Sequence, residues 1–328
     1  MKTVRSLVGA ALWRLRPLIR STFTEFRLAE QFSNPSMHEK MLLDTVRCES
    51  YRAAIAKVVR PGDVVLDLGA GTGLLSLFCV AAGAKHVYAV EMSRIADVAE
   101  RLITANSARD KITILRGNSR NVRLPEPADV LVTETLSSAG FDNEDIIDYV
   151  LDARRRLLKP GARMIPVSVE TLFAPIQSEA FGIGRLTPAL YGLDYAPFRK
   201  ARYSGPGMMQ ASGKPFVQLA EPRRCWASDL RADVVATPKE ARLEFEVTRD
   251  GRVDGFLAWF DALLAPGVSL DDSPHHPPTS WEQLYFPAVD QPRVRAGQVV
   301  RLTVDPRLKR GESHWEYQIE VRDSHPST

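Results

Sequence analysis

Cysteine is scarce in this chain of 328 residues. Its three cysteines, Cys48, Cys79 and Cys225, are far apart and form no C-x-x-C pair. The chain therefore lacks the spacing that predicts a disulfide framework or a structural zinc site. We expect a protein of a reducing compartment, the cytoplasm, that carries no metal.

The chain also has little net charge and no long apolar run. The 43 basic and 40 acidic residues leave a net charge of +3, and no basic run alternates with aromatic residues, so nucleic acid is not an expected partner. The longest mostly apolar run, Leu74–Ala84, is too short to cross a bilayer. The length exceeds that of a usual single domain and predicts two domains.

Acidic residues are missing from residues 1–24, where basic and aliphatic residues alternate at roughly helical spacing. We interpret residues 1–31 as a basic N-terminal helical segment. It is expected to pack on the domain that follows it. The alternatives are a weak contact with a membrane surface or a partner, or a transit peptide, which would also be rich in arginine.

The stretch VVLDLGAGTG at Val64–Gly73 predicts a buried strand that runs into a glycine turn. Small residues in that turn allow a ligand to approach the backbone closely. A dinucleotide fingerprint requires G-x-G-x-x-G. The spacing here is G-x-G-x-G, which is the pattern of Rossmann-like methyltransferases that bind S-adenosylmethionine (SAM). The predicted cofactor-binding residues of this stretch are Asp67, Gly69, Gly71 and Gly73.

Strands and helices alternate over residues 60–170, which predicts a doubly wound, mostly parallel α/β sheet of the Rossmann type. The second strand ends in Glu91, 18 residues after Gly73, close to the spacing expected of a carboxylate that binds ribose hydroxyls. Helical segments are expected within residues 23–60, divided near Asn34-Pro35, and at 74–82, 94–106 and 144–159, the last capped by Lys159-Pro160-Gly161. Strands are expected at 64–66, 86–91, 112–115 and 127–133.

The sequence changes character after Pro166, where prolines become frequent and β-forming residues cluster. We expect a β-rich second domain, a barrel or sandwich, over residues 167–328. The long stretch Phe181–Met209 is predicted to form an arm, because loops of that length are usually functional or pack on a partner. Strands are expected at 242–248, 255–263, 299–304 and 314–321.

Two carboxylates, Glu134 and Glu144, flank a loop after the fourth predicted strand, at the expected mouth of the cofactor pocket. Motifs of base-modifying methyltransferases are absent there, and no third acid or histidine completes a metal site. Paired carboxylates suit a guanidinium, which is planar, stays charged and offers five donors. The alternative is that both are ordinary acids of a loop and of a helix N-terminus.

From about Phe32 to Arg322 the chain resembles the protein arginine methyltransferase family. The resemblance rests on the helix MHEKMLLD with Arg47 and Tyr51, on the glycine turn, on Val90-Glu91, and on the two glutamates. It extends to Ile165-Pro166 and Thr279-Ser280-Trp281. It implies a SAM-binding domain over residues 32–166, followed by a β-barrel domain with an inserted arm near 181–209 through which the family usually forms dimers.

The resemblance also implies roles for single residues. His38, Arg47, Gly69, Glu91 and Ser119 would contact the cofactor, and Arg47 would hold its carboxylate. Glu134 and Glu144 would be catalytic and hold the guanidinium, Met41 would lie against the substrate side chain, and Trp281 would close the site.

Three departures from the family pattern affect the prediction. The two glutamates are ten residues apart and not nine, so either Asn143 or Glu144 takes the second place. Ser280 replaces a histidine, which resembles the symmetric-dimethylating branch, whereas Met41 resembles the asymmetric one, and the product type is open. Arg120 stands where an acid usually lies near the adenine.

We expect a SAM-dependent N-methyltransferase that acts on arginine in a protein or peptide, and that forms a homodimer. One alternative is methylation of a small guanidino or amino metabolite. Another is a degenerate fold that binds SAM poorly and acts as a scaffold.

Overall fold

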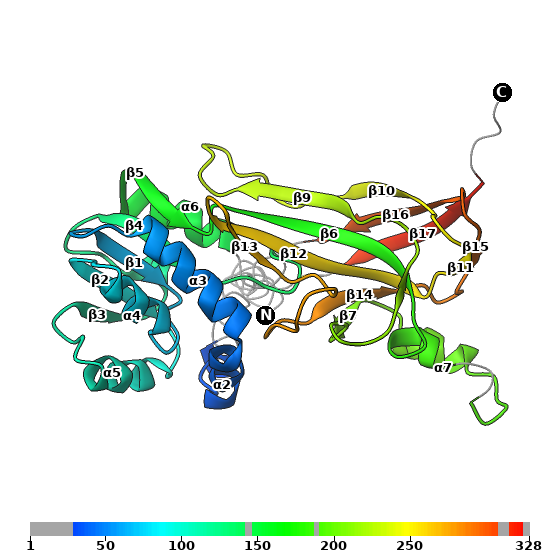
Figure 1. Ribbon diagram of the computed structural model, residues 1–328, viewed down its shortest axis with the longest axis horizontal. Helices are drawn as coiled ribbons and strands as arrows, with labels where there is room; N and C mark the ends of the chain where they lie inside the picture. The colour runs from blue at the N-terminus through cyan, green and yellow to red at the C-terminus, as the bar shows by residue number, and fades with distance from the viewer. Residues whose placement is uncertain (1–28, 142–145, 187–189, 308–314, 324–328) are drawn as a thin grey trace, which may run out of the picture.

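The computed structural model describes residues 29–141, 146–186, 190–307 and 315–323, and shows an elongated molecule with a parallel α/β domain at one end and a β-rich domain at the other (Figure 1). The interpretations of residues 1–24 and the second carboxylate, Glu144, lie outside these ranges.

Two helices precede the parallel sheet, α2 (Pro35–Leu43) and α3 (Thr45–Val58). Asn34 caps α2, and Pro35 occupies its first turn, where a missing N–H costs nothing. The expected division near Asn34-Pro35 is confirmed, but the second break at Asp44 was not predicted. It arises because the Asp44 carboxylate accepts a hydrogen bond from the Arg47 N–H and so starts a new helix.

The parallel sheet has the strand order β3-β2-β1-β4-β5, with every pairing parallel. A mostly parallel α/β sheet was predicted, but its fifth strand, β5, was not. All five residues of β1 are buried, as expected of a central strand covered on both faces. The strands are β1 (Val64–Leu68), β2 (His86–Glu91), β3 (Ile112–Arg116), β4 (Ala128–Thr133) and β5 (Leu158–Ile165), and the helices between them are α4 (Leu74–Ala81), α5 (Ala96–Ala105), the short 3₁₀ turn η1 (Ser119–Asn121) and α6 (Ile146–Arg156).

The predicted end of the last of these helices is wrong. The helix α6 ends at Arg156, and Lys159, Pro160 and Gly161 belong to β5 instead of capping it. The chain turns at Leu157, whose carbonyl accepts from the Ala128 N–H at the start of β4. Pairing with β4 therefore begins at once and ends the helical run early.

The second domain is antiparallel and β-rich, as predicted. Its largest sheet has the order β7-β14-β12-β6-β8, with β13 beside β12 and β9 beside β6, and a three-stranded sheet has the order β10-β16-β17. The strands are β6 (Ser168–Gln177), β7 (Gly207–Met209), β8 (Val217–Gln218), β9 (Arg223–Asp229), β10 (Ala241–Glu246), β11 (Gly251–Arg252), β12 (Gly255–Ala265), β13 (Val268–Asp271), β14 (Gln283–Pro287), β15 (Arg293–Val294), β16 (Val299–Asp305) and β17 (Glu316–Arg322).

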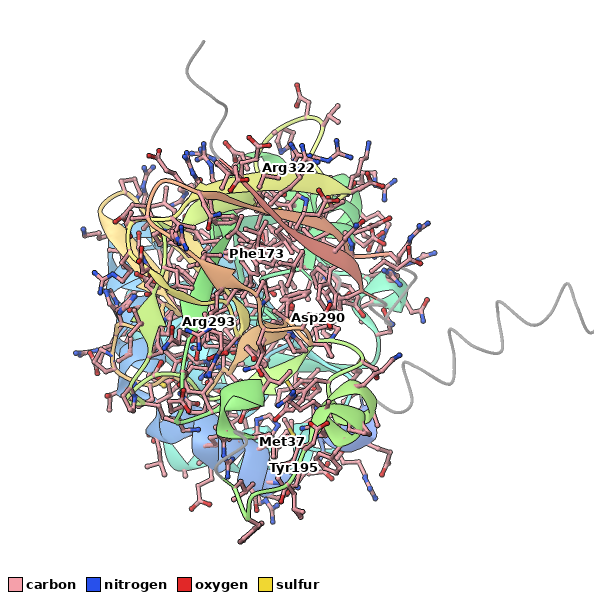
Figure 2. All side chains as sticks on the ribbon, turned by 90° about the vertical axis from the view of Figure 1, so that its right-hand side faces the viewer. Met37, Phe173, Tyr195, Asp290, Arg293 and Arg322 are labelled. Carbon is pink, nitrogen blue, oxygen red and sulfur yellow. The ribbon has the colours of Figure 1, made fainter. Side chains whose placement is uncertain are left out.

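A core of aromatic side chains fills this domain. Phe173 of β6 is fully buried and packs on Phe286 and Trp226 with ring centroids 5.3 and 5.8 Å apart. Figure 2 shows Phe173 in the interior and Tyr195 at the bottom of the molecule. Tyr195 belongs to the predicted arm, whose described part contains η2 (Gly182–Arg185) and α7 (Ala196–Arg202) before β7 returns to the sheet.

The two domains share a core through α3. One cluster of buried side chains includes Tyr51 and Ile55 of α3, the strands of the parallel sheet, and Phe260 and Leu270 of the β-rich domain. The helix therefore fixes the β-rich domain relative to the parallel sheet. Within the described ranges, no helix combines the length and apolarity needed to cross a bilayer.

Candidate active site

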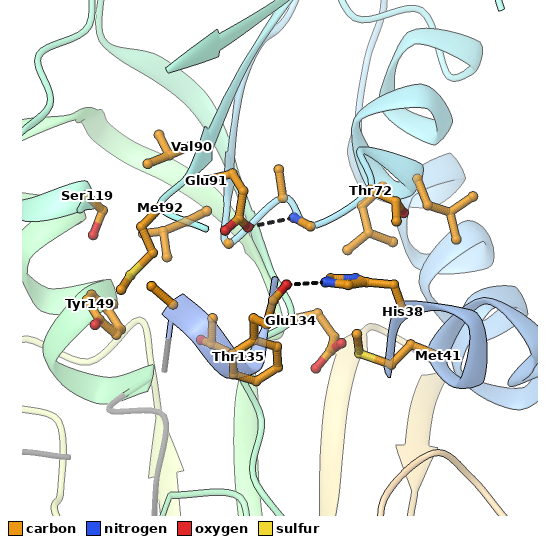
Figure 3. A pocket seen from close by; sticks show the side chains of 18 of the residues that line it. His38, Met41, Thr72, Val90, Glu91, Met92, Ser119, Glu134, Thr135 and Tyr149 are labelled. Carbon is orange, nitrogen blue, oxygen red and sulfur yellow. Dashed lines mark hydrogen bonds between the residues drawn. The ribbon is translucent and has the colours of Figure 1, made fainter. Parts of the chain in front are cut away.

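A pocket of about 140 Å³ lies at the carboxyl ends of β1, β2 and β4 (Figure 3). The strand β1 has β2 on one side and β4 on the other, so the strand order reverses direction at β1. Open α/β sheets bind ligands at such a topological switch point, and the pocket lies there. The ends of β1 and β4 are aligned, because Leu68 and Thr133 are register partners and the Thr133 hydroxyl donates to the Leu68 carbonyl over 2.9 Å.

The predicted glycine turn forms one wall of this pocket. Gly69 and Gly71 have φ angles of +76° and +54°, in the left-handed region that favours glycine. A Cβ on Gly71 would lie 3.2 Å from Cε1 of His38, and one on Gly69 would lie 3.0 Å from the Thr135 side chain. Any larger residue would therefore crowd side chains that line the pocket.

Replacing Gly71 by alanine is expected to weaken the binding of the predicted SAM cofactor roughly tenfold, because the added methyl group crowds His38. The matched control is Gly62→Ala, since Gly62 also has a positive φ, +91°, but no atom within 4 Å of its Cβ position. Calorimetric titration with S-adenosylhomocysteine measures the effect. Equal losses of affinity in the two variants would show that backbone strain alone, and not the pocket, is responsible.

Glu91 ends β2 and points into the centre of the pocket, where the sequence placed it. One of its oxygens accepts from the Gly71 N–H at 2.9 Å and the other from the Ser93 N–H at 2.6 Å. The carboxylate is therefore fixed in direction by two backbone groups and is 7% exposed. Each oxygen keeps a lone pair, which suits the vicinal hydroxyls of a ribose.

The segment around Phe32 and the helix α2 cover the pocket from one side. The Phe32 carbonyl accepts from the Ser93 hydroxyl at 3.2 Å and lies 2.7 Å from Nε2 of His38. Both Phe32 and His38 line the cavity, as does Met41 one turn later. His38 and Met41, predicted to contact the cofactor and the substrate side chain respectively, therefore both line this pocket.

Arg47 and Glu134 form a buried ion pair at the end of the pocket next to Met41. Nε and Nη2 of Arg47 lie 2.7 and 2.5 Å from the same Glu134 oxygen, Oε2. The side chains are 11% and 7% exposed. A third Arg47 donor, on Nη1, reaches the Met41 carbonyl at 3.1 Å. Arg47 was predicted to clamp a ligand carboxylate. Two of its five N–H groups bind Glu134 and two reach the Met41 carbonyl and the Cys48 sulfur, which leaves one for a ligand.

Burial and the ion pair act on the pKa of Glu134 in opposite directions. Burial raises the pKa of Glu134 above its ordinary value, and the charge and hydrogen bonds of Arg47 oppose this rise without cancelling it. Burial is the largest single influence on the pKa of Arg47 and lowers it. The charge and hydrogen bonds of Glu134, with smaller contributions from Cys48 and Tyr51, together outweigh burial, and the guanidinium pKa is raised. A second cation beside Glu134 would favour its charged form further.

Some predicted site residues support the pocket without lining it. Asp67 is fully buried under the glycine turn, where it accepts from the Ser76 hydroxyl at 2.6 Å, and burial raises its pKa to about 6. Gly73 also lies outside the lining. Trp281 donates to the Leu136 carbonyl over 2.6 Å and packs edge-on against Phe260.

The segment Thr279-Ser280-Trp281 is attached to both domains. Besides the bond made by Trp281, the Ser280 N–H donates to Asp44, the residue that separates α2 from α3. The Thr279 hydroxyl donates to Asp272, which is 1% exposed. The other Asp272 oxygen, Oδ2, has no partner among the described residues. Burial raises the pKa of Asp272 to about 7, with the Thr279 bond opposing the rise.

Asp272→Asn is expected to flatten the pH dependence of stability. Because the pKa in the folded state lies above the ordinary value near 4, Asp272 stabilises the fold at low pH, and this contribution is lost as the pH rises toward 8. The loss is on the order of 4 kcal/mol, since each pKa unit corresponds to about 1.4 kcal/mol. Urea unfolding at pH 4 to 8 measures it. Parallel curves for the wild type and the variant would contradict this expectation.

Several pocket residues had no signal in the sequence. Thr72, Met92 and Thr135 line the cavity, and each directly follows a predicted site residue in the sequence. Their residue types gave no indication of a role in binding or catalysis. Tyr149 of α6 also lines it and belongs to a helix face that periodicity alone cannot orient. Arg120 does not line the cavity, and its guanidinium lies over the Tyr149 ring.

Comparison with known proteins identifies the family. A family model described as arginine methyltransferase oligomerization subdomain matches residues 189–322, and one described as ribosomal protein L11 methyltransferase matches residues 50–166. Protein arginine N-methyltransferase 1 of Schizosaccharomyces pombe is 32% identical over 305 residues, which cover 89% of this chain and 87% of that protein. The chain belongs to the protein arginine N-methyltransferase family.

Other members of the family agree with this assignment. Protein arginine N-methyltransferase 6 of Xenopus laevis is 33% identical over 269 residues, 77% of this chain and 78% of that protein. The Trypanosoma brucei PRMT1 enzyme–prozyme heterotetrameric complex with AdoHcy has a TM-score of 0.75 at 25% identity over 88% of this chain and 99% of that one. Protein arginine methyltransferase 10 of Arabidopsis thaliana shares the fold, with a TM-score of 0.77 at 24% identity over 90% and 95% of the two chains.

Proposed function

We propose that this protein transfers a methyl group from SAM to a guanidino nitrogen of arginine in a protein or peptide. The observation that carries the proposal is the buried carboxylate of Glu134, which directly follows β4 beside a glycine-walled pocket. Family membership supports the same reaction class, since the relatives are named for it.

The residues of the pocket fit such a donor. The absence of a side chain at Gly71 lets His38, which lines the pocket, lie close against the turn, because a Cβ there would be 3.2 Å from Cε1 of His38. Glu91 is held with its carboxylate toward the centre of the pocket, which suits ribose. The Ser119 hydroxyl lines the cavity and has no hydrogen-bond partner among the described residues. At the other end Arg47 offers its remaining N–H group to an amino-acid carboxylate.

Glu134 would bind the guanidinium of the acceptor and orient it for in-line attack. When bound, SAM supplies an electrophilic methyl group on a sulfonium. A bond forms between the guanidino nitrogen and this methyl carbon, the sulfur–carbon bond breaks with its electron pair left on sulfur, and the nitrogen then loses a proton. A carboxylate next to the guanidinium draws positive charge away from the attacking nitrogen, and it can accept that proton.

The test is methyl transfer from isotopically labelled SAM to three acceptors: a peptide with one arginine, the same peptide with lysine in its place, and free arginine. We expect label on the guanidino nitrogen of the arginine peptide, located by fragmentation mass spectrometry, and none on the lysine peptide. Faster labelling of free arginine would overturn the proposed substrate class in favour of a small metabolite. No labelling of any acceptor would overturn the proposed activity.

We further propose that the protein forms a homodimer through its arm. Tyr191, Leu193 and Phe198 of the arm are 83%, 59% and 57% exposed, which is unusual for large apolar side chains in a monomer. The match of residues 189–322 to an oligomerization subdomain supports the same interpretation. Light scattering after gel filtration should give twice the chain mass for the wild type and a monomer for Phe198→Asp. A monomeric wild type would overturn it.

A further inference from the structure

Residues 279–281, the bridging segment, connect the two elements that hold the buried ion pair of the pocket. At one end the Ser280 N–H donates to one oxygen of Asp44. The other Asp44 oxygen accepts from the Arg47 N–H over 2.9 Å at the start of α3. The position of the bridging segment is therefore coupled to the position of the helical turn that carries Arg47.

The other end of the bridging segment is attached to the loop that carries Glu134. The Trp281 indole donates over 2.6 Å to the carbonyl of Leu136, a residue that is 1% exposed. The backbone N–H of Leu136 is in turn a hydrogen-bond partner of the Glu134 carboxylate. A shift of Trp281 would therefore move the backbone that directs this carboxylate.

We propose that Asp272 is a positioning residue for methyl transfer, which holds the bridging segment where it aligns Glu134 with the acceptor. The Thr279 hydroxyl donates to one oxygen of Asp272, and the Gln283 side chain donates to its backbone carbonyl over 3.0 Å. Because Thr279 precedes Trp281 and Gln283 follows it, Asp272 holds the chain on both sides of the indole. This inference rests on the proposed function, since it assumes that Glu134 binds the acceptor.

Asp272 is itself fixed by the interior of the β-rich domain. Its N–H donates over 3.0 Å to the carbonyl of Phe260 in β12, and the Phe260 ring packs edge-on against Trp281 with centroids 5.0 Å apart. Phe260 is fully buried, as is Gln283, whose side-chain oxygen accepts from the Ala211 N–H over 3.0 Å. One buried part of the domain thus sets both the carboxylate and the indole that it positions.

The neutral form of Asp272 suits this role better than the charged form. Its second oxygen, Oδ2, is buried and has no partner among the described residues. The charged groups that act on it, Asp271 at the end of β13 and Asp44 before α3, are both acidic. Burial and these two acids raise the pKa of Asp272 to about 7, against the hydrogen bonds of Thr279 and Gln283. Above that pH a buried charge disfavours this arrangement of the bridging segment.

Methyl transfer from SAM to an arginine peptide at pH 6 tests the positioning role. Asp272→Ala should lower kcat about 10- to 100-fold, as expected when a reacting group is misplaced. Asp272→Asn keeps the oxygen that accepts from Thr279 and should retain kcat within about twofold. The affinity of both variants for S-adenosylhomocysteine should stay within about twofold of the wild type, because the backbone groups that hold Glu91 lie in the parallel domain.

The pH profile separates positioning from a merely structural role. The ratio of kcat in the wild type to kcat in Asp272→Asn should be near one at pH 6 and decline with a midpoint near pH 7, because only the wild type ionises there. The titration of Glu134 cancels in this ratio, since both proteins carry it. A ratio that stays constant from pH 6 to pH 8 would overturn the role of neutral Asp272.

Asp261→Asn is the matched control. Asp261 is the register partner of Asp271, has a side-chain oxygen without a partner among the described residues, and burial raises its pKa to about 6. Because successive residues of a strand point to opposite faces, Asp261 lies on the face of β12 opposite to Phe260. Its substitution should change neither kcat nor the pH profile. Equal effects of the two substitutions would overturn the specific role of Asp272.

Hydrogen exchange provides a readout that does not depend on activity. In Asp272→Ala the amides of residues 135–137 and 279–283 should lose protection, whereas Asp261→Asn should keep it. Thermal unfolding verifies that each variant is folded, and if Asp272→Ala does not fold, the pH profile of Asp272→Asn decides. If the wild type methylates the peptide and folded Asp272→Ala matches it, only the inference fails. If the wild type methylates no acceptor, the proposed function fails and the inference fails with it.

Discussion

Replacing Glu134 by glutamine is expected to lower kcat/KM for an arginine peptide by about 10²- to 10³-fold, the usual cost of removing one preorganised electrostatic group. The acceptor is a cation, and Glu134 is the described carboxylate at the end of the pocket next to Met41. Glutamine has nearly the same shape as glutamate but no charge, so it cannot stabilise the positively charged guanidinium of the acceptor electrostatically. Single-turnover methyl transfer under saturating SAM measures the loss.

The same substitution should destabilise the fold, because it leaves the buried Arg47 guanidinium without its counter-ion. We expect a loss of about 3 kcal/mol in the free energy of unfolding. The matched control is Glu49→Gln, since Glu49 pairs with Arg52 on the surface and is 59% exposed, and such pairs contribute less than about 1 kcal/mol. If Glu134→Gln lost no more stability and activity than Glu49→Gln, the buried pair would have neither role.

Asp254→Asn is expected to cost about 3 kcal/mol of stability and to loosen the base of the arm. Asp254 is fully buried, and its carboxylate accepts from Arg252, from the Gln291 side chain and from the Ser178 N–H over 2.6, 2.7 and 2.8 Å. Its backbone carbonyl accepts from the Tyr285 hydroxyl, which in turn accepts from the Ile183 N–H of η2. The network therefore joins the arm to β12 and β14.

Hydrogen exchange locates this effect. Amides of residues 178–186 should lose more protection in Asp254→Asn than amides of the parallel sheet. The control is Asp229→Asn, because Asp229 makes a surface ion pair with Arg231 and is 45% exposed. Uniform loss of protection across both domains would show that Asp254 supports the whole fold and not the arm in particular.

Four of the five strands of the parallel sheet could be predicted from sequence because they are short and mostly apolar; β1, for example, is apolar apart from Asp67. The break at Asp44 was missed because a capping bond depends on how a side chain folds back, which periodicity does not register. The strand β6 was missed because it contains a proline and a glutamate, yet it pairs along most of its length with β12 and β9.

The candidate site shows a similar division. Glu91, the glycine turn and Glu134 follow strand ends, and parallel strands bring their carboxyl ends to one edge, so their proximity was predictable. The ion pair between Arg47 and Glu134 was not predictable. The two residues are 87 positions apart, and their contact depends on the orientation of α3 relative to the sheet. The contact of Arg120 with Tyr149 was also not predictable, since two elements, η1 and α6, meet there only in three dimensions.

The most direct measurement of the central claim compares an arginine peptide with the same peptide carrying citrulline, a neutral side chain of nearly identical shape, in the presence of S-adenosylhomocysteine. If Glu134 holds a charged guanidinium, the wild type should bind the arginine peptide about 10- to 100-fold more tightly, as expected for hydrogen bonds between charged groups. Glu134→Gln should lose most of that preference. Equal affinities of the wild type for the two peptides would contradict the account.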